Sequence, residues 1–275
     1  MTAAMVEAAV AALRARAGAV APKLCIVTGS GLGAALEAVE VRTRLAAAEI
    51  PGFPVSGVQG HAGQVLLGRL KGQDVACLSG RAHAYEGHAP GALALPLRTM
   101  RAVGCEAAVL VSTVGSINPE IAPGRLALVA DHINITGYSP LIGPNDDAVG
   151  PRFPGMAEAY DPQLRATARR AGEAAGLKLA EGVMVHHMGP SFETPAQIRA
   201  CRLLGGDLVG MSMVPETVIA RHCGLKVLGI GAVTNMGTGL GPPPSHDDTL
   251  AGARSLARDV GTLLGALMER WAGPC

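Results

Sequence analysis

Short apolar runs, each ended by a glycine or a polar residue, recur along the chain and predict the strands of a sheet. Several are apolar throughout instead of alternating, which is typical of strands covered on both faces. We expect strands at Leu24–Thr28, Val65–Leu70, Val75–Ser79, Ala107–Ser112, Leu126–Ala130, Gly182–His186, Leu208–Met211 and Val227–Val233.

Stretches with helical periodicity separate several of these runs, and this alternation favours an α/β fold. We expect helices at Gly33–Val39, Pro162–Ala175, Pro195–Leu204, Pro215–Cys223 and about Leu250 to Trp271, with an amphipathic helix at the N-terminus. Proline at the start of three of them suits a first turn, where its missing N–H costs nothing.

The glycine- and proline-rich stretches at 51–60, 137–155 and 237–246 are too short to be linkers and too apolar to be disordered. They are typical of ordered functional loops, and the composition of 237–246 makes it our candidate for a mobile lid. We therefore expect one domain over residues 1–275, because the chain has no repeat and no charged block.

Composition excludes several classes of protein. With 49% hydrophobic residues and a mean hydropathy of +0.31, the chain is not disordered. The charges balance at 23 − 22 = +1 and only seven residues are Phe, Trp or Tyr, so nucleic acid is not an expected partner. No apolar run reaches the roughly 18 residues of a membrane span, so no membrane association is expected.

The six cysteines are scattered singly, with no C-x-x-C pair, so neither a zinc ribbon nor a disulfide framework is expected. The N-terminus lacks the basic start and apolar stretch of a signal peptide. Both observations favour a reducing, cytoplasmic location.

A glycine turn follows the first strand in the string Thr28-Gly-Ser-Gly-Leu-Gly33-Ala34. Glycine allows close approach of the backbone, and a following helix would offer free N–H groups to an anion. The string also fits G-x-G-x-x-A, so a dinucleotide, a mononucleotide or phosphate, and a merely tight turn all remain open. Ser30 adds a hydroxyl that can donate to a phosphate oxygen.

Histidines and an arginine gather in two further loops. His61 lies among glycines, and Arg81, His83 and Tyr85 alternate after the strand that ends at Ser79. In extended backbone the three would project to one side as a donor-rich patch suited to phosphate and a hydroxyl; a polar loop with an Arg81–Glu86 pair is the alternative. His61, His83 and His88 lack the spacing of metal ligands, so no metal is expected.

Polar side chains also follow the later strands, where α/β enzymes gather their sites. Phe192 and Glu193 place an aromatic face beside a carboxylate, although Ser191 or Thr194 could simply cap the next helix. The remaining candidates at strand ends are Met211, Ser212, Thr234, Asn235 and, before the last helix, His246 beside a possible cap at Ser245.

These motifs together resemble the trimeric purine nucleoside phosphorylases. The matching strings, in the family's order, are Gly29–Gly33, Gly60–Gly63, Gly80–Gly87, Asp131–Asn134, Gly143–Asp146, Arg152–Pro154, Gly189–Thr194, Val209–Ser212, Ala220–Leu225 and Thr234–Asn235. The resemblance implies a single domain with a mixed central sheet flanked by helices. It also implies a homotrimer that converts a purine nucleoside and phosphate into the free base and (deoxy)ribose 1-phosphate, without metal or organic cofactor.

The resemblance also assigns roles by position. It implies a phosphate site of Ser30, His61, Arg81, His83, Thr113 (through its backbone) and Ser212. It implies a ribose site of Tyr85, Met211 and His246, with Phe153 lent by the neighbouring subunit, and a base site of Phe192, Glu193, Thr234 and Asn235. The residues assigned directly to catalysis are Asn235, Glu193 and His83.

The residue types suit this chemistry. The purine leaves with electron density on its imidazole ring, which Asn235 can stabilise by donating to N7. Glu193 is an acceptor for the N1–H that 6-oxopurines have and adenine lacks, so inosine and guanosine are the expected substrates. Phosphate, held beside the cationic sugar, is itself the nucleophile.

The sequence departs from the family pattern at Thr113, Val114, Met213 and Met236. These departures bear on the preference among 6-oxopurines and leave the reaction class intact. The alternatives are a phosphorylase of 5′-methylthionucleosides, which would have no use for His246 at a 5′-hydroxyl, a nucleoside-binding protein without turnover, and an NAD enzyme built on the glycine turn.

Overall fold

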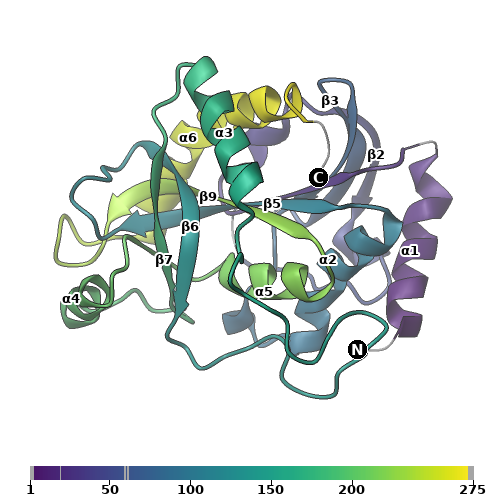
Figure 1. Cartoon of the computed structure of the whole chain (residues 1–275), viewed down its shortest axis with the longest axis horizontal. Coiled ribbons are helices and arrows are strands. Elements are labelled where there is room, and N and C mark those ends of the chain that lie inside the picture. The colour runs from purple at the N-terminus through teal and green to yellow at the C-terminus, as the bar shows by residue number, and fades with distance from the viewer. Residues whose placement is uncertain (1–2, 19, 59, 61, 272–275) are drawn as a thin grey trace.

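The computed structural model describes residues 3–18, 20–58, 60 and 62–271, and within them nine strands form one mixed sheet (Figure 1). The predicted α/β fold is confirmed. The strands are β1 (Leu24–Thr28), β2 (Glu40–Ala46), β3 (Gln64–Leu70), β4 (Gln73–Ser79), β5 (Ala107–Ser116), β6 (Arg125–Asn134), β7 (Ala180–His186), β8 (Leu208–Gly210) and β9 (Lys226–Met236).

The strand order is β2-β3-β4-β1-β5-β8-β7-β6-β9, and β9 pairs back onto β5. Strands β5, β8, β7, β6 and β9 therefore close a ring, while β2, β3 and β4 extend from it through β1. The pairs β1–β4, β1–β5, β5–β9, β6–β7 and β7–β8 are parallel, and the pairs β2–β3, β3–β4, β5–β8 and β6–β9 are antiparallel.

Helices cover both faces of the sheet (Figure 1). They are α1 (Ala3–Ala17), α2 (Pro90–Val103), α3 (Pro162–Ala174), α4 (Pro195–Leu203), α5 (Val214–His222) and α6 (His246–Met268). Helices α1, α2 and α5 share one core cluster with one face, and α3 and α6 share another with the opposite face. Along β5, Ala108 and Leu110 belong to the first cluster and Val109 and Val111 to the second, which explains the uninterrupted apolar run.

The helix starts follow the predicted chemistry. Proline occupies the first turn of α3, α4 and α5. The carboxylate of Asp161 caps α3 by accepting from the N–H groups of Gln163 and Leu164, and Ser245 caps α6 through the N–H of Asp248. Helix α6 therefore begins at His246, one turn before the predicted Leu250. The predicted N-terminal helix is present as α1 and buries Ala9, Val10 and Leu13, but its apolar residues are spread around the helix, so the predicted amphipathic pattern is wrong.

Two elements escaped prediction, and one predicted helix is shorter. Strand β2 is an exposed antiparallel edge strand in which only Leu45 is buried. Helix α2 contains Pro96, which interrupts its helical pattern. The predicted helix at Gly33–Val39 is a 3₁₀ turn over Gly33–Leu36. Because the strand after it is antiparallel, the fold lacks the parallel second strand of a dinucleotide-binding unit, which removes the NAD alternative.

No helix among the described residues has the length and apolar character needed to cross a lipid bilayer. The cysteines at 25, 77, 105, 201 and 223 are free and buried, consistent with a packing role, whereas Cys275 lies outside the described residues.

Candidate active site

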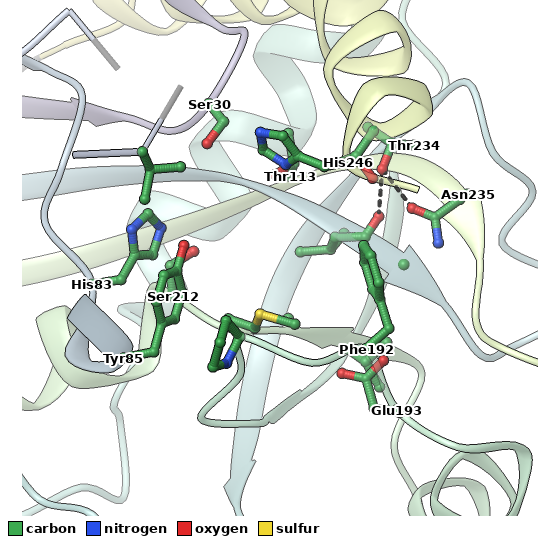
Figure 2. A pocket seen from close by; sticks show the side chains of 18 residues that line it. Ser30, His83, Tyr85, Thr113, Phe192, Glu193, Ser212, Thr234, Asn235 and His246 are labelled. Carbon is green, nitrogen blue, oxygen red and sulfur yellow. Dashed lines mark hydrogen bonds between the residues drawn. The ribbon is translucent and has the colours of Figure 1, made fainter. Parts of the chain in front are cut away.

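A cavity of about 430 Å³ lies where β5, β8 and β9 end, next to the start of α6. Figure 2 shows Ser30, His83, Tyr85 and Ser212 along one side and Phe192, Thr234 and Asn235 along the other. The cavity is lined by Ser30, Val58, His83, Tyr85, Thr113, Val114, Gly115, Pro190, Phe192, Glu193, Val209, Gly210, Met211, Ser212, Thr234, Asn235, His246 and Thr249. Twelve of these are sequence-derived site residues or the departures Thr113 and Val114.

The side of the cavity formed by residues 83 and 85 is organised by a pair of stacked rings. The centroids of His83 and Tyr85 lie 4.7 Å apart at an interplanar angle of 15°. Residues 84–86 form a 3₁₀ turn, so the predicted extended run with Arg81, His83 and Tyr85 on one face is wrong. Burial, with a contribution from Glu86, raises the pKa of Tyr85 to about 12, so its hydroxyl stays protonated.

Glu86 holds His83 and the loop beside it. Its carboxylate accepts from the backbone N–H of His83 at 2.7 Å, from the N–H of Gly57 at 2.8 Å and from the hydroxyl of Ser56. Burial alone would raise the pKa of Glu86, but these hydrogen bonds lower it overall. The carboxylate is therefore ionised and accepts from Nδ1 of His83 at 3.1 Å.

The protonation of His83 follows from its surroundings. Burial, and then the positive charge of Arg81, lower the pKa of His83 below its ordinary value, although Glu216 and Glu86 oppose the shift. The ring is therefore neutral near pH 7, and with Nδ1–H directed at Glu86 it can only accept a hydrogen bond at Nε2.

Arg81 lies behind the wall of the cavity and is not among its lining residues. Its guanidinium donates to Oγ of Ser112 at 2.5 Å and to the carbonyls of Val27 and Val111, and its Nε pairs with Glu216 at 3.1 Å. The alternative pair with Glu86 is therefore wrong. Arg81 supplies a buried positive charge next to Ser212, whose hydroxyl donates to Ser112 at 3.1 Å.

Thr234 and Asn235 are consecutive in β9, yet both line the cavity. Consecutive residues of a regular strand face opposite sides. Here the β5–β9 register passes from Val114↔Val233 to Gly115↔Asn235, so Thr234 is the extra residue of a β-bulge. The bulge turns both side chains toward one space.

Phe192 and Glu193 follow β7 in the segment that leads to α4. Thr194 caps that helix by accepting from the N–H of Gln197, so the structural role proposed for the hydroxyl is confirmed. Glu193 itself is buried, with 7% of its surface exposed, and Phe192 is 40% exposed. Cys201 lies behind Glu193: burial, and then the charge of Glu193, raise the pKa of this thiol, which contacts Nε2 of His187 at 3.3 Å.

Met211 packs against a glycine that the site requires. Gly189 has φ +71°, and a Cβ there would overlap the sulfur of Met211 and lie 3.2 Å from Cδ1 of Tyr85. The close approach at Gly189 brings together Met211 and Tyr85, two of the residues predicted to bind ribose. His246, at the first residue of α6, reaches the same cavity from the opposite side (Figure 2).

Besides Arg81, one predicted site residue that the structure describes does not line the cavity. Phe153 is 89% exposed, in the loop between β6 and α3. This loop is closed by Arg152, which donates to the carbonyls of Gly143 and Leu141. His61 lies outside the described residues.

Some contributors were not singled out from the sequence. Val58, Pro190, Val209 and Thr249 line the cavity, and Ser112 and Glu216 support it from behind. Apolar or small residues at these positions carry no separate signal, but Glu216, three residues after a turn and at a helix start, has the spacing of a capping residue. Within the described ranges, no three His, Cys, Asp or Glu side chains converge as metal ligands would.

Comparison with known proteins gives consistent matches. The sequence profile of the Phosphorylase superfamily matches residues 23–269. The chain is 42% identical over 252 residues to purine nucleoside phosphorylase 1 of Geobacillus stearothermophilus, covering 91% of this chain and 92% of that one. Among solved structures, purine nucleoside phosphorylase of Schistosoma mansoni with adenosine matches with a TM-score of 0.92 and 33% identity, over 98% of both chains. The same protein with inosine matches with a TM-score of 0.91 and 32% identity, over 99% and 98%.

Proposed function

The chain belongs to the Phosphorylase superfamily and, within it, to the purine nucleoside phosphorylases, and on this premise we propose a specific reaction for its cavity. The reaction is the reversible phosphorolysis of 6-oxopurine ribo- and deoxyribonucleosides, with inosine and guanosine as substrates, as in purine salvage. The observation that carries the proposal is a single cavity with hydroxyls and a histidine along one side and an amide along the other, close to an aromatic ring and a carboxylate.

The phosphate belongs on the side formed by Ser30, His83 and Ser212. Hydroxyls donate to phosphate oxygens, and a neutral His83 that accepts at Nε2 suits an oxygen of phosphate that still carries a proton. Arg81 adds positive charge from behind the wall, and the backbone at Thr113 adds a donor. We keep His61 in this site by its position in the sequence.

The sugar lies in the middle of the cavity. Tyr85 and Met211 form its apolar support, where they meet at Gly189, and His246 is placed for the 5′-hydroxyl. A group with this role has no partner in a 5′-thioether, so His246 favours ordinary nucleosides over 5′-methylthionucleosides.

The base lies against Phe192, between Glu193 and Asn235. Glu193 accepts from N1–H of a 6-oxopurine, and Asn235 donates from Nδ2 to N7. Thr234 supports this geometry, because its hydroxyl donates to Oδ1 of Asn235 at 2.8 Å. The Schistosoma mansoni protein was solved in complex with adenosine. The selectivity of this chain for the 6-substituent of the purine should therefore be measured directly.

The chemistry needs no covalent intermediate with the protein. An oxygen of phosphate attacks C1′ as the C1′–N9 bond breaks, and the electron pair of that bond moves onto the purine. Asn235 stabilises the developing charge on the imidazole ring at N7, and the phosphate stabilises the oxocarbenium-like sugar. The purine takes up a proton as the attacking hydrogen phosphate loses one, and the products are free base and (deoxy)ribose 1-phosphate. No metal or organic cofactor has a role in this scheme.

The functional unit that we propose is a homotrimer. Phe153 is almost fully exposed in one chain, and Ile142 nearby is 65% exposed. We assign Phe153 to the sugar pocket of the neighbouring subunit, where its exposed ring would be covered. We place the enzyme in the cytoplasm.

The decisive experiment measures the release of free base from inosine, guanosine, xanthosine and adenosine, each with and without phosphate. We expect release from inosine or guanosine that depends on phosphate, with adenosine inert. Release without phosphate would identify a hydrolase, and binding of nucleoside without turnover would identify a binding protein. Rapid phosphorolysis of adenosine would overturn the specificity while leaving the reaction class in place.

A further inference from the structure

The backbone is strained immediately after Ser212. Among the described residues only Lys71 and Met213 combine a side chain with positive φ, and Met213 has φ +71° and ψ −49°. The N–H of Val214 donates to the carbonyl of Ser212 at 2.9 Å, which makes Met213 the centre of a γ-turn of the rare positive-φ kind. Such conformations persist only where their surroundings hold them.

Glu216 holds this turn from the first turn of α5. Its Oε2 accepts from the N–H of Met213 at 2.5 Å, and the N–H of Thr217 donates to the carbonyl of Met213 at 2.7 Å. The side chain of Met213 is fully buried. Its sulfur would lie 2.9 Å from a Cβ on Gly229, so β9 leaves it no room to move inward. The turn fixes where the chain leaves the cavity wall, and therefore where Ser212 points.

The second oxygen of the same carboxylate lies 3.1 Å from Nε of Arg81. Only 4% of the Arg81 side chain and 14% of the Glu216 side chain are exposed. A small cavity of about 60 Å³ beside the pair is lined largely by apolar side chains, among them Phe53, Leu78 and Leu97. An ion pair in such surroundings is strongly sensitive to the loss of one partner.

The contacts form a closed circuit. Glu216 binds Arg81, Arg81 donates to Ser112, Ser112 accepts from Ser212, and Met213 next to Ser212 donates back to Glu216. Two segments more than 100 residues apart in sequence are thereby fixed relative to each other by one side chain. Glu216 is not among the residues that line the 430 Å³ cavity.

We infer that Glu216 is a positioning residue for the phosphate half of the site. The inference rests on the proposed function, because it assigns Ser212 and Arg81 to phosphate. By holding the strained turn with one oxygen and the arginine with the other, Glu216 sets the hydroxyl of Ser212 and the charge of Arg81 in one arrangement. A capping box requires only Glu or Gln at this position, so the ion pair of Glu216 with Arg81 goes beyond what capping α5 needs.

The test compares Glu216→Gln and Glu216→Asp with Glu181→Gln, which removes a carboxylate paired with Arg165 and Arg169 away from the cavity. Phosphate is varied at saturating inosine and inosine at saturating phosphate, and the affinity for phosphate alone is measured by calorimetry. In E216Q the amide places N–H groups against Arg81, and in E216D the carboxylate reaches only one of its two partners.

We expect both Glu216 variants to lose about 10- to 100-fold in kcat/KM for phosphate, by analogy with the outer-shell partners of metal ligands. The KM for inosine should stay within about threefold and E181Q should match the wild type, since neither change touches the base side of the cavity. Ser112→Ala removes a neutral member of this hydrogen-bonded network. It should lower the affinity for phosphate less than the Glu216 variants do. Its effect should not add to that of E216Q, because the two residues act in one network.

The outcomes separate this inference from the proposed function. If the wild type cleaves inosine with phosphate but E216Q keeps the wild-type affinity for phosphate, Glu216 does not position this site. Equal losses for both substrates, together with a lower unfolding temperature, would show a purely structural role and also overturn the inference. A wild type that binds phosphate without phosphorolysis contradicts the proposed function, and calorimetry on E216Q and S112A still decides the role of Glu216.

Discussion

The hydroxyl of Thr234 donates to Oδ1 of Asn235 at 2.8 Å, and Nδ2 of Asn235 donates to the carbonyl of Met236 at 2.9 Å. These two bonds fix the orientation of the amide before any ligand binds, and they leave the second hydrogen of Nδ2 for an acceptor in the cavity. Preorganised donors of this kind are the groups that stabilise a developing negative charge without reorganisation.

Asn235→Ala should therefore lower kcat for inosine by about 10²- to 10³-fold, the usual effect of removing one preorganised donor. Steady-state kinetics measure the loss, and far-UV circular dichroism checks that the fold is intact. Thr234→Val, which keeps the amide but frees its orientation, should cause a smaller loss. If N235A kept the wild-type kcat/KM, Asn235 would not contact the leaving base.

Glu193→Ala should remove the preference for 6-oxopurines. The loss of a hydrogen bond to a charged acceptor costs about 1.5–3 kcal/mol, so kcat/KM for inosine should fall by about 10- to 150-fold. The value for adenosine should change little, because adenine has no N1–H to donate. The ratio of the two kcat/KM values is the measurement, and an unchanged ratio would place the base elsewhere in the cavity.

His186 should make the protein sensitive to acid. Burial lowers the pKa of this fully buried histidine to about 4, whereas an unfolded histidine titrates near 6.5. Because the folded pKa is the lower one, the unfolded state binds the proton first. This contribution to stability is therefore present above about pH 6.5 and lost as the pH falls toward 4.

The loss amounts to about 2 kcal/mol of unfolding free energy between pH 7.5 and pH 5. Urea unfolding at the two pH values measures it. His186→Met, which fills a similar volume and cannot titrate, should lose about that much less unfolding free energy over the same pH interval. Equal pH dependence in the wild type and H186M would contradict the assignment.

If the proposed homotrimer forms, Phe153→Ala should impair catalysis although Phe153 lies outside the cavity of its own chain. Uncovering a pocket normally closed by a Phe side chain costs about 1.5–3 kcal/mol, so kcat/KM should fall by roughly 10- to 150-fold. Mixed oligomers of F153A and N235A chains give the sharpest test. Sites with an intact Asn235 and a neighbour's Phe153 should recover activity, whereas a protein with self-contained sites would show none.

Much of the fold could be predicted, because strands that are buried on both faces consist of consecutive apolar residues. Strand β1 was located to the residue and β4 and β3 within two. Strand β2 was missed because it lies at an edge with most of its side chains in water, and α2 because Gly91 and Pro96 break its periodicity. Such elements are held by tertiary contacts and leave little local signal.

For the site, the sequence could place side chains at strand ends but could not determine their directions. Ser30, His83 and Asn235 line the cavity as such placement suggests. Arg81 does not, because its guanidinium finds a carboxylate and carbonyls behind the wall. Glu216, which holds it there, lies 135 residues further along the chain, so only the folded structure joins the two.

The bulge at Thr234 means that the length of β9, and not only its composition, determines the shape of the cavity wall. With Thr234 deleted, the ladder with β5 would become regular, with Val233 and Asn235 still opposite Val114 and Gly115, and the cavity would lose the hydroxyl that donates to Oδ1 of Asn235. Substitutions in this strand can therefore change the cavity wall, whereas a deletion at Thr234 would remove one of its two adjacent side chains. In a library designed to alter the preferred base, the number of residues in β9 between Val233 and Met236 should be held constant.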